Sequence, residues 1–185
     1  MRDSSDPDLV ARAQGGDVDA IGALYDQHHE SIFRYVWLRV GDRHLAEDLT
    51  GDVFMRMLAA LPHYQAVGLP FQAWLYRIAR NLLVDHYRKE NNRVSVPLDT
   101  IEDSYEGEED PTSAFDRKLD TQRLHRALSQ LDQSHREVVV LRFVSGLSLR
   151  EVALTLDRTE AAVKALQHRG LVALRLTLSQ EKVTR

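Results

Sequence analysis

Residues 148–170 read SLREVALTLDRTEAAVKALQHRG, and this stretch contains the clearest structural signal in the chain. Its apolar spacing predicts a helix over 149–156, and a tight turn is expected at residues 157–158. A second helix is expected to begin at Thr159 or Glu160. Two short helices joined by a turn of three or four residues form a helix-turn-helix, whose second helix enters the major groove of DNA.

The second helix of this motif has two different faces. At about 100° per residue, one side is expected to face the core and carries Ala162, Val163, Leu166 and Gly170. The opposite side carries Ala161, Lys164, Ala165, Gln167 and His168, with Arg169 at its edge. Small residues let a helix approach base edges, and cationic or amide side chains bond to phosphates or bases. An ordinary amphipathic helical hairpin gives the same spacing, so the pattern alone leaves that alternative open.

Residues 70–93 combine aromatic with basic side chains. This is the combination that binds single-stranded DNA, because rings stack on bases and cations bind the backbone. The aromatic residues are Phe71, Trp74, Tyr76 and Tyr87, and the basic residues include Arg77, Arg80, Arg88 and Lys89. The apolar stripe of the expected helix favours a core position for Trp74. For Tyr64 and Tyr76, a core position and an exposed stacking role both remain open.

Helical periodicity extends over almost the whole chain, without an alternating strand pattern or a hairpin dipeptide. We expect an all-α protein with two small helical domains, over residues 1–92 and 113–185, joined by a flexible acidic linker over 93–112. Helices are expected over about 8–14, from Asp17 to Gly41, from Asp42 to Pro62, from Pro70 to about 91–92, and over about 113–131. Capping-box patterns predict two further helix starts, at Ser134 and Ser148.

The composition, 43% hydrophobic and 28% charged, is that of an ordinary globular protein. No cysteine is present, which excludes a disulfide framework, a thiol nucleophile and cysteine-ligated metal sites. The first residues contain no apolar signal-peptide core, and no apolar run approaches the roughly 20 residues of a membrane span. We therefore expect a cytoplasmic protein without membrane insertion.

The net charge of −4 hides an asymmetry along the chain. Residues 91–116 carry a charge of −7, whereas residues 117–185 carry +6. A basic segment beside an acidic one suggests a polyanionic partner for the basic part. Charge alone leaves open the alternative of a solvated surface with random patches.

No catalytic constellation is found in the sequence. A phosphate loop, a His-Glu-x-x-His motif and a Ser/His/Asp order are missing, and the eight histidines are scattered. Adjacent pairs such as Glu47 and Asp48, or His28 and His29, diverge by about 100° on a helix, so they cannot share a substrate or a metal ion. We therefore expect neither an enzyme nor a metal or cofactor site.

Two blocks of sequence resemble one known family. Residues 46–54 (AEDLTGDVF) and 71–81 (FQAWLYRIARN) are similar to region 2 of an extracytoplasmic-function (ECF, group IV) sigma factor of the sigma-70 family. Residues 148–170 resemble region 4 of the same family. The resemblance implies that region 2 binds the clamp coiled coil of the RNA polymerase core and opens the −10 promoter element. It implies that region 4 binds the flap and reads the −35 element, in a bacterial factor often held by an anti-sigma partner.

The resemblance also implies roles for single residues. Contact with core polymerase would fall to Glu47, Asp48 and Asp52. A loop over residues 63–69 would capture a flipped base, so the −10 contacts would be Tyr64, Gln65, Arg77, Arg80, Asn81, His86, Arg88 and Lys89. The −35 contacts would be Thr159, Lys164, Ala165, Gln167, His168 and Arg169.

The chain departs from the family pattern at several positions. Many relatives have glutamine in place of Gly51 and glycine in place of Asp157; aspartate tolerates the left-handed conformation, so the turn is expected to persist. Leu166 and Ala162 replace a common arginine and threonine, so the −35 sequence cannot be inherited from the family. A stand-alone helix-turn-helix regulator is the alternative function, and it would explain the second domain but not the block at 46–81.

Overall fold

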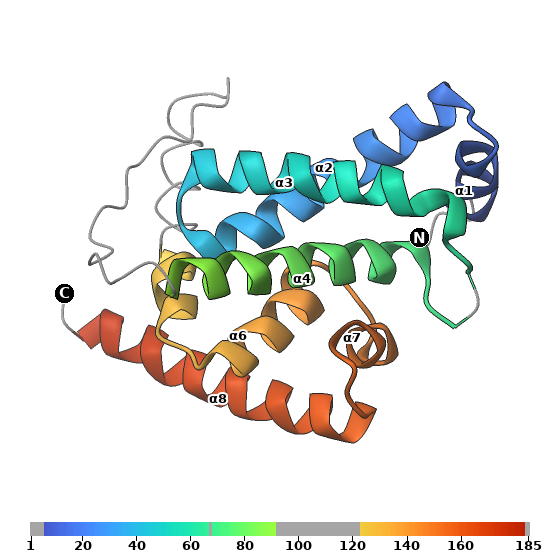
Figure 1. Ribbon diagram of the computed structural model, residues 1–185. Coiled ribbons are helices and arrows are strands. Elements are labelled where there is room, and N and C mark those ends of the chain that lie inside the picture. The colour runs from blue at the N-terminus through green and yellow to red at the C-terminus, as the bar shows by residue number, and fades with distance from the viewer. Residues whose placement is uncertain (1–5, 67, 92–122, 184–185) are drawn as a thin grey trace, which may run out of the picture.

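The computed structural model describes residues 6–66, 68–91 and 123–183, and the regular elements in these ranges are all helical (Figure 1). The first part contains α1 (Asp6–Gln14), α2 (Val18–Val40), α3 (Arg43–Ala60), the 3-10 turn η1 (Leu61–His63) and α4 (Phe71–Asn91). The second part contains a helical segment over 123–129, α6 (Gln133–Val139), the π-helical η2 (Val140–Val144), α7 (Leu149–Leu156) and α8 (Glu160–Val183). The expected all-α class is confirmed, while the expected linker over residues 93–112 lies outside the described ranges.

Short polar residues and glycine fix the helix ends of the first part, as the sequence predicts. The Asp17 carboxylate accepts two backbone N–H groups at the start of α2, and Gly41 ends that helix at a left-handed φ of 76°. A Cβ at Gly41 would also lie 3.0 Å from the ring of His125. Asp42 caps α3, which gives way to the short turn that contains Pro62.

The second part confirms one predicted helix start and corrects the other. Ser148 and Glu151 form the expected capping box at α7, and Asp157 ends that helix at a φ of 53°. The expected cap at Ser134 is wrong, because α6 begins earlier. The Asp132 carboxylate takes the N–H of Ser134 at 2.9 Å, so an aspartate two residues upstream supplies the cap.

Helix α8 crosses α6 closely at Gly170. A Cβ placed there would lie 2.9 Å from Cγ2 of Val139 and 3.3 Å from the carbonyl oxygen of His135. We expect Gly170→Ala to lower the free energy of unfolding by about 1–3 kcal/mol, because the crossing helices must shift apart. Urea unfolding measures this. Gly22→Ala is the control: a Cβ at Gly22 meets nothing within 4 Å, so it should stabilise α2 slightly. An unchanged midpoint for Gly170→Ala would contradict the close crossing.

The two parts of the chain pack against each other. In Figure 1, α4 lies between α2 and α3 on one side and the C-terminal helices on the other, and buried apolar residues of both parts form one cluster. Helix α7 packs on α4, where the Thr155 hydroxyl lies 3.3 Å from the carbonyl oxygen of Ala73. The ring of His125 lies 5.6 Å from that of Trp37 on α2. The candidate DNA contacts of α4 and α8 therefore belong to one packed body.

Candidate nucleic-acid interface

Helix α8 divides into the two faces that the helix-turn-helix pattern predicts. On its inner side, Val163, Leu166 and Gly170 are buried and Ala162 is half-buried. On its outer side, Ala161, Lys164, Ala165, His168 and Arg169 are exposed. The inner side packs on α6 and α7, which fixes the helix in place. The outer side presents small and cationic side chains, the kind that approach a DNA groove.

Thr159 has a structural task at the start of α8. Its Oγ1 accepts the backbone N–H of Ala162 at 3.2 Å, which satisfies one of the open donors at the helix N-terminus. The residue is exposed and its hydroxyl proton can still be donated. Its contact with DNA therefore stays a prediction, made by a side chain that also caps the helix.

Gln167 is less available than the sequence predicts. Its Oε1 accepts a hydrogen bond from Nε of Arg142 at 3.0 Å, and the residue is only half-exposed. Arg142 also donates to the carbonyl oxygen of Leu147 and lies over the ring of Phe143 at 5.8 Å. The expected outward position of Gln167 is thus corrected, because it lies at the edge of the face where η2 reaches it.

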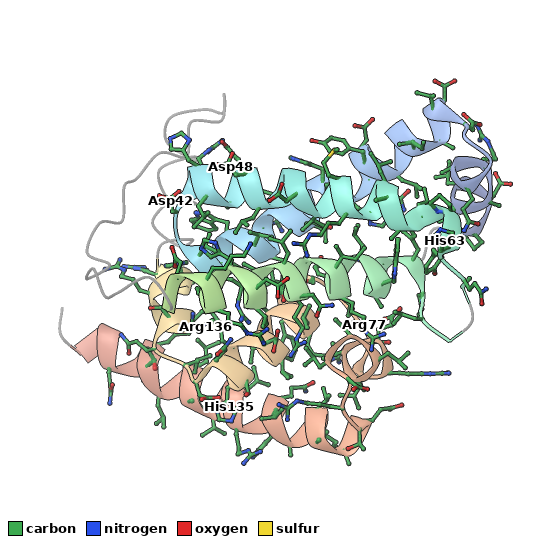
Figure 2. The ribbon with its side chains drawn as sticks, viewed as in Figure 1. Asp42, Asp48, His63, Arg77, His135 and Arg136 are labelled. Carbon is green, nitrogen blue, oxygen red and sulfur yellow. The ribbon has the colours of Figure 1, made fainter. Side chains whose placement is uncertain are left out.

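The six −10 candidates on α4 differ in their surroundings. Asn81, Arg88 and Lys89 are exposed, whereas Arg77, Arg80 and His86 are half-buried. His86 Nε2 lies 3.5 Å from a carboxylate oxygen of Glu90. Arg77 lies on the side of α4 where α7 packs (Figure 2). Arg80 Nε lies 3.0 Å from Oε1 of Glu137 on α6, so in this structure its charge is paired with the second part of the chain.

The tyrosine expected to capture a base is part of the core. Tyr64 is only 9% exposed, its hydroxyl donates to the carbonyl oxygen of Leu69 at 2.8 Å, and its ring lies 4.6 Å from that of Trp74. A ring held this way has no open face for a base, which corrects the stacking role of Tyr64. Tyr76 is fully buried, and burial raises the pKa of its hydroxyl. Gln65 is exposed and remains a candidate.

The polymerase-contact candidates on α3 are exposed carboxylates. Asp48 points away from the bundle (Figure 2), and Asp52 lies one turn further along the exposed side of the helix. Glu47 accepts a hydrogen bond from Nε of Arg43 at 2.8 Å, so part of its charge is compensated within the helix. Asp48 and Asp52 are therefore the better placed of the three to meet a partner.

Two further apolar residues of the same helix are exposed, although the sequence pattern did not predict a role for them. Met55 is 67% exposed and Leu58 is 38% exposed. Both lie off the apolar stripe of α3, which buries Leu49, Val53 and Met57. An apolar side chain outside the stripe of its helix is the signal in the sequence that identifies such residues.

In the described ranges, each helix is too short or too polar to span a membrane.

Comparisons with known proteins agree with this geometry. Residues 24–93 match Sigma-70 region 2, and residues 127–176 match Sigma-70, region 4. The chain is 39% identical to the ECF RNA polymerase sigma factor BldN of Streptomyces coelicolor, over 90% of this chain and 63% of BldN. It is 32% identical to the ECF RNA polymerase sigma factor SigL of Mycobacterium tuberculosis, over 95% of this chain and 98% of SigL.

Solved structures show the same fold. The structure of CnrH in complex with the cytosolic domain of CnrY superposes with a TM-score of 0.76 at 25% identity, over 96% of this chain and 99% of that one. The sigma factor RpoE in complex with the anti-sigma factor NepR from Bartonella quintana gives a TM-score of 0.69 at 21% identity, over 85% and 96%. The likeness to CnrH extends across both halves of the chain.

A helix-turn-helix with an exposed basic face, joined to a helical bundle that carries its own aromatic and basic helix, defines a DNA-binding transcription factor. The matches to regions 2 and 4, in the order typical of the family, identify the class of transcription factor: the chain belongs to the ECF sigma factors of the sigma-70 family. It is an RNA polymerase sigma factor, a protein that binds core polymerase and promoter DNA. A stand-alone regulator would leave the match to region 2 without explanation.

Proposed function

We propose that this sigma factor reads the −35 element with the outer face of α8. The observation that carries the proposal is the division of that helix: Lys164 and Arg169 are exposed while Val163 and Leu166 anchor the opposite side in the core. A recognition helix must be rigid and must carry side chains that reach base edges and phosphates. Ala165, between the cations, is small enough to let the helix approach the groove.

We propose further that α4 and the loop before it open the −10 element. Asn81, Arg88 and Lys89 are exposed on one helix, and they supply donors and positive charge for a separated DNA strand. With Tyr64 buried, recognition of a base in the loop falls to the exposed Gln65. Gln14 supports this loop from α1, since its Nε2 donates to the carbonyl oxygens of Leu61 and Tyr64 at 2.9 and 2.7 Å.

Core polymerase is proposed to dock on what we call the α3 surface, formed by Asp48, Asp52, Met55 and Leu58. These residues are exposed, and their spacing places them along one side of the helix. Two carboxylates beside two apolar side chains fit a partner that offers basic and apolar groups in the same arrangement. The clamp coiled coil is the proposed occupant, with the flap bound by region 4.

An anti-sigma factor is the further partner that we propose. The relative RpoE is solved in complex with an anti-sigma factor, and CnrH in complex with the cytosolic domain of CnrY.

We also propose domain limits of 1–92 and 113–185 with a linker over 93–112, which the matched ranges 24–93 and 127–176 support. A factor that works on core polymerase acts where the chromosome is, so we place it in the bacterial cytoplasm.

Run-off transcription tests the proposed function. Bacterial core polymerase with the purified chain should give discrete transcripts from a subset of genomic fragments, and core polymerase alone should give none of them. Co-migration of the chain with core polymerase in gel filtration is the parallel measurement. A chain that neither co-migrates with core polymerase nor yields a transcript would rule the proposal out.

A further inference from the structure

Glu137 is a buried carboxylate that lies between two arginines of the other half of the chain. Its Oε1 is 3.0 Å from Nε of Arg80 and 3.7 Å from Nη1 of Arg39. The side chains of Glu137 and Arg39 are only 11% and 3% exposed, and that of Arg80 is 30% exposed. Glu137 belongs to α6, whereas the arginines belong to α2 and α4. The three charges therefore join region 2 to region 4.

Two other contacts join the same regions, one on each side of this charged cluster. The Thr155 hydroxyl of α7 approaches the carbonyl oxygen of Ala73, near the start of α4. The ring of His125 packs against Trp37, near the end of α2. Region 4 is thus held on region 2 along much of the length of α4, and Glu137 provides the charged contact within that interface.

The closed arrangement cannot serve a whole promoter. The centres of the −35 and −10 elements are about 25 base pairs apart, which is about 85 Å at 3.4 Å per base pair. A compact chain of this length has a radius of gyration of about 16 Å. Helix α7 of region 4, which is proposed to read the −35 element, packs directly on α4 of region 2, which is proposed to open the −10 element. In addition, the charge of Arg80, a candidate for −10 DNA, is taken up by Glu137. Both facts require the regions to separate before the promoter is bound.

We propose that Glu137 is an autoinhibitory latch, which holds region 4 on region 2 in the free chain and releases Arg39 and Arg80 for the DNA backbone when core polymerase separates the regions. The inference rests on the proposed function, since only a chain that must reach both elements has to open. No second protein is needed for this form of inhibition, because both sides of the contact belong to one chain.

The chemistry of the cluster suits a switch. A buried ion pair adds little net stability compared with two solvated charges, yet removal of one partner leaves the other as a strongly disfavoured buried charge. The contact is therefore either fully made or fully broken. The ion pair itself therefore costs core polymerase little to break when both charges regain water, and the two arginines then meet phosphate in place of carboxylate.

The experiment measures the distance between the regions in the full chain, without polymerase or DNA. The chain has no cysteine, so Ala59→Cys on α3 and Val172→Cys on α8, both exposed, give a clean pair of spin labels. With an otherwise wild-type sequence, pulsed electron paramagnetic resonance should give a single short distance between the two labels. Glu137→Gln, which keeps the shape and removes the charge, should raise the population at longer distances by about tenfold or more.

Glu30→Gln is the matched control, because it removes an exposed ion pair with Arg34 and should leave the distances unchanged. Arg80→Gln is the second opening variant; its side chain is partly exposed, so it decides the matter if Glu137→Gln does not fold. Binding of the free chain to a promoter fragment should tighten by about tenfold in Glu137→Gln, since less energy is needed to open it. Arg80→Gln also removes a candidate DNA contact, so this variant is judged by its distance distribution alone.

The outcomes separate the latch from the proposed function. Distance distributions for Glu137→Gln and Arg80→Gln that match wild type would overturn the latch, even if run-off transcription succeeds. Opening in both variants, with tighter promoter binding by Glu137→Gln, supports it. Opening in a chain that never supports run-off transcription would overturn the inhibitory role while the charge-held interface remains. Glu137→Gln is measured by distance and by run-off, and Arg80→Gln by distance, so neither failure can be mistaken for the other.

Discussion

Replacement of Lys164 and Arg169 together by alanine is expected to reduce transcription from a −35-dependent promoter by about a hundredfold or more. Both side chains are exposed on the outer face of α8, and the buried side of the helix does not need them. A cation that reads a base edge contributes about 1–3 kcal/mol, and the two sites are separate enough to act nearly independently. The fold should be unaffected, because neither residue contributes to the core.

The measurement is run-off transcription at several salt concentrations, together with core binding. Arg34→Ala is the matched control: it removes an exposed cation from α2 that no proposed DNA contact involves. A single variant that only lowers the salt slope by about one identifies a phosphate contact, while a change in the preferred −35 base identifies base reading. Full promoter activity in the double variant would mean that the recognition face lies elsewhere.

Asp52→Lys is expected to weaken binding to core polymerase by about a hundredfold and to abolish transcription from all promoters alike. Asp52 is exposed at the centre of the α3 surface, so the change alters no packing. A lysine there would set like charges against a basic partner, which costs several kcal/mol. Met55→Ala should weaken core binding more mildly, because it removes a side chain that is 67% exposed in the free chain and buried only in a complex.

Fluorescence titration of labelled chain with core polymerase measures this loss directly. Asp26→Lys is the matched control, since Asp26 is an exposed carboxylate on another helix, α2, and is not one of the residues of the α3 surface. Both charge reversals change the net charge equally, so a difference between them reports the site and not the overall field. Equal binding by the two variants would show that core polymerase docks on another face.

Much of the fold could be predicted from the order of residues alone. The capping of α2 by Asp17, the capping box at Ser148 and the turn at Asp157 all depend on groups within a few positions of each other. The division of α8 into an inner and an outer face follows from its period of 3.6 residues in the same way. Such features are local, so the helices of the helix-turn-helix could be placed before any contact between helices was known.

The state of individual polar and aromatic side chains could not be predicted in this way. Tyr64 is held by Leu69 and Trp74, and Gln167 is held by Arg142, which lies 25 positions away in the sequence. The periodicity of a helix tells which side of it is apolar, but not which neighbour covers the edge of that side. These residues are therefore the ones at which the predicted site needed correction.

Helix limits, turn chemistry and the faces of α8 are matters of neighbouring residues, and the amino-acid order already contains them. The joining of Arg80 to Glu137 is different, because 57 positions separate the two. They meet only when the two halves pack, and burial then makes their pairing obligatory. A surface that a helical pattern offers to DNA can be taken by another part of the same chain, since exposure depends on what the rest of the molecule places against it.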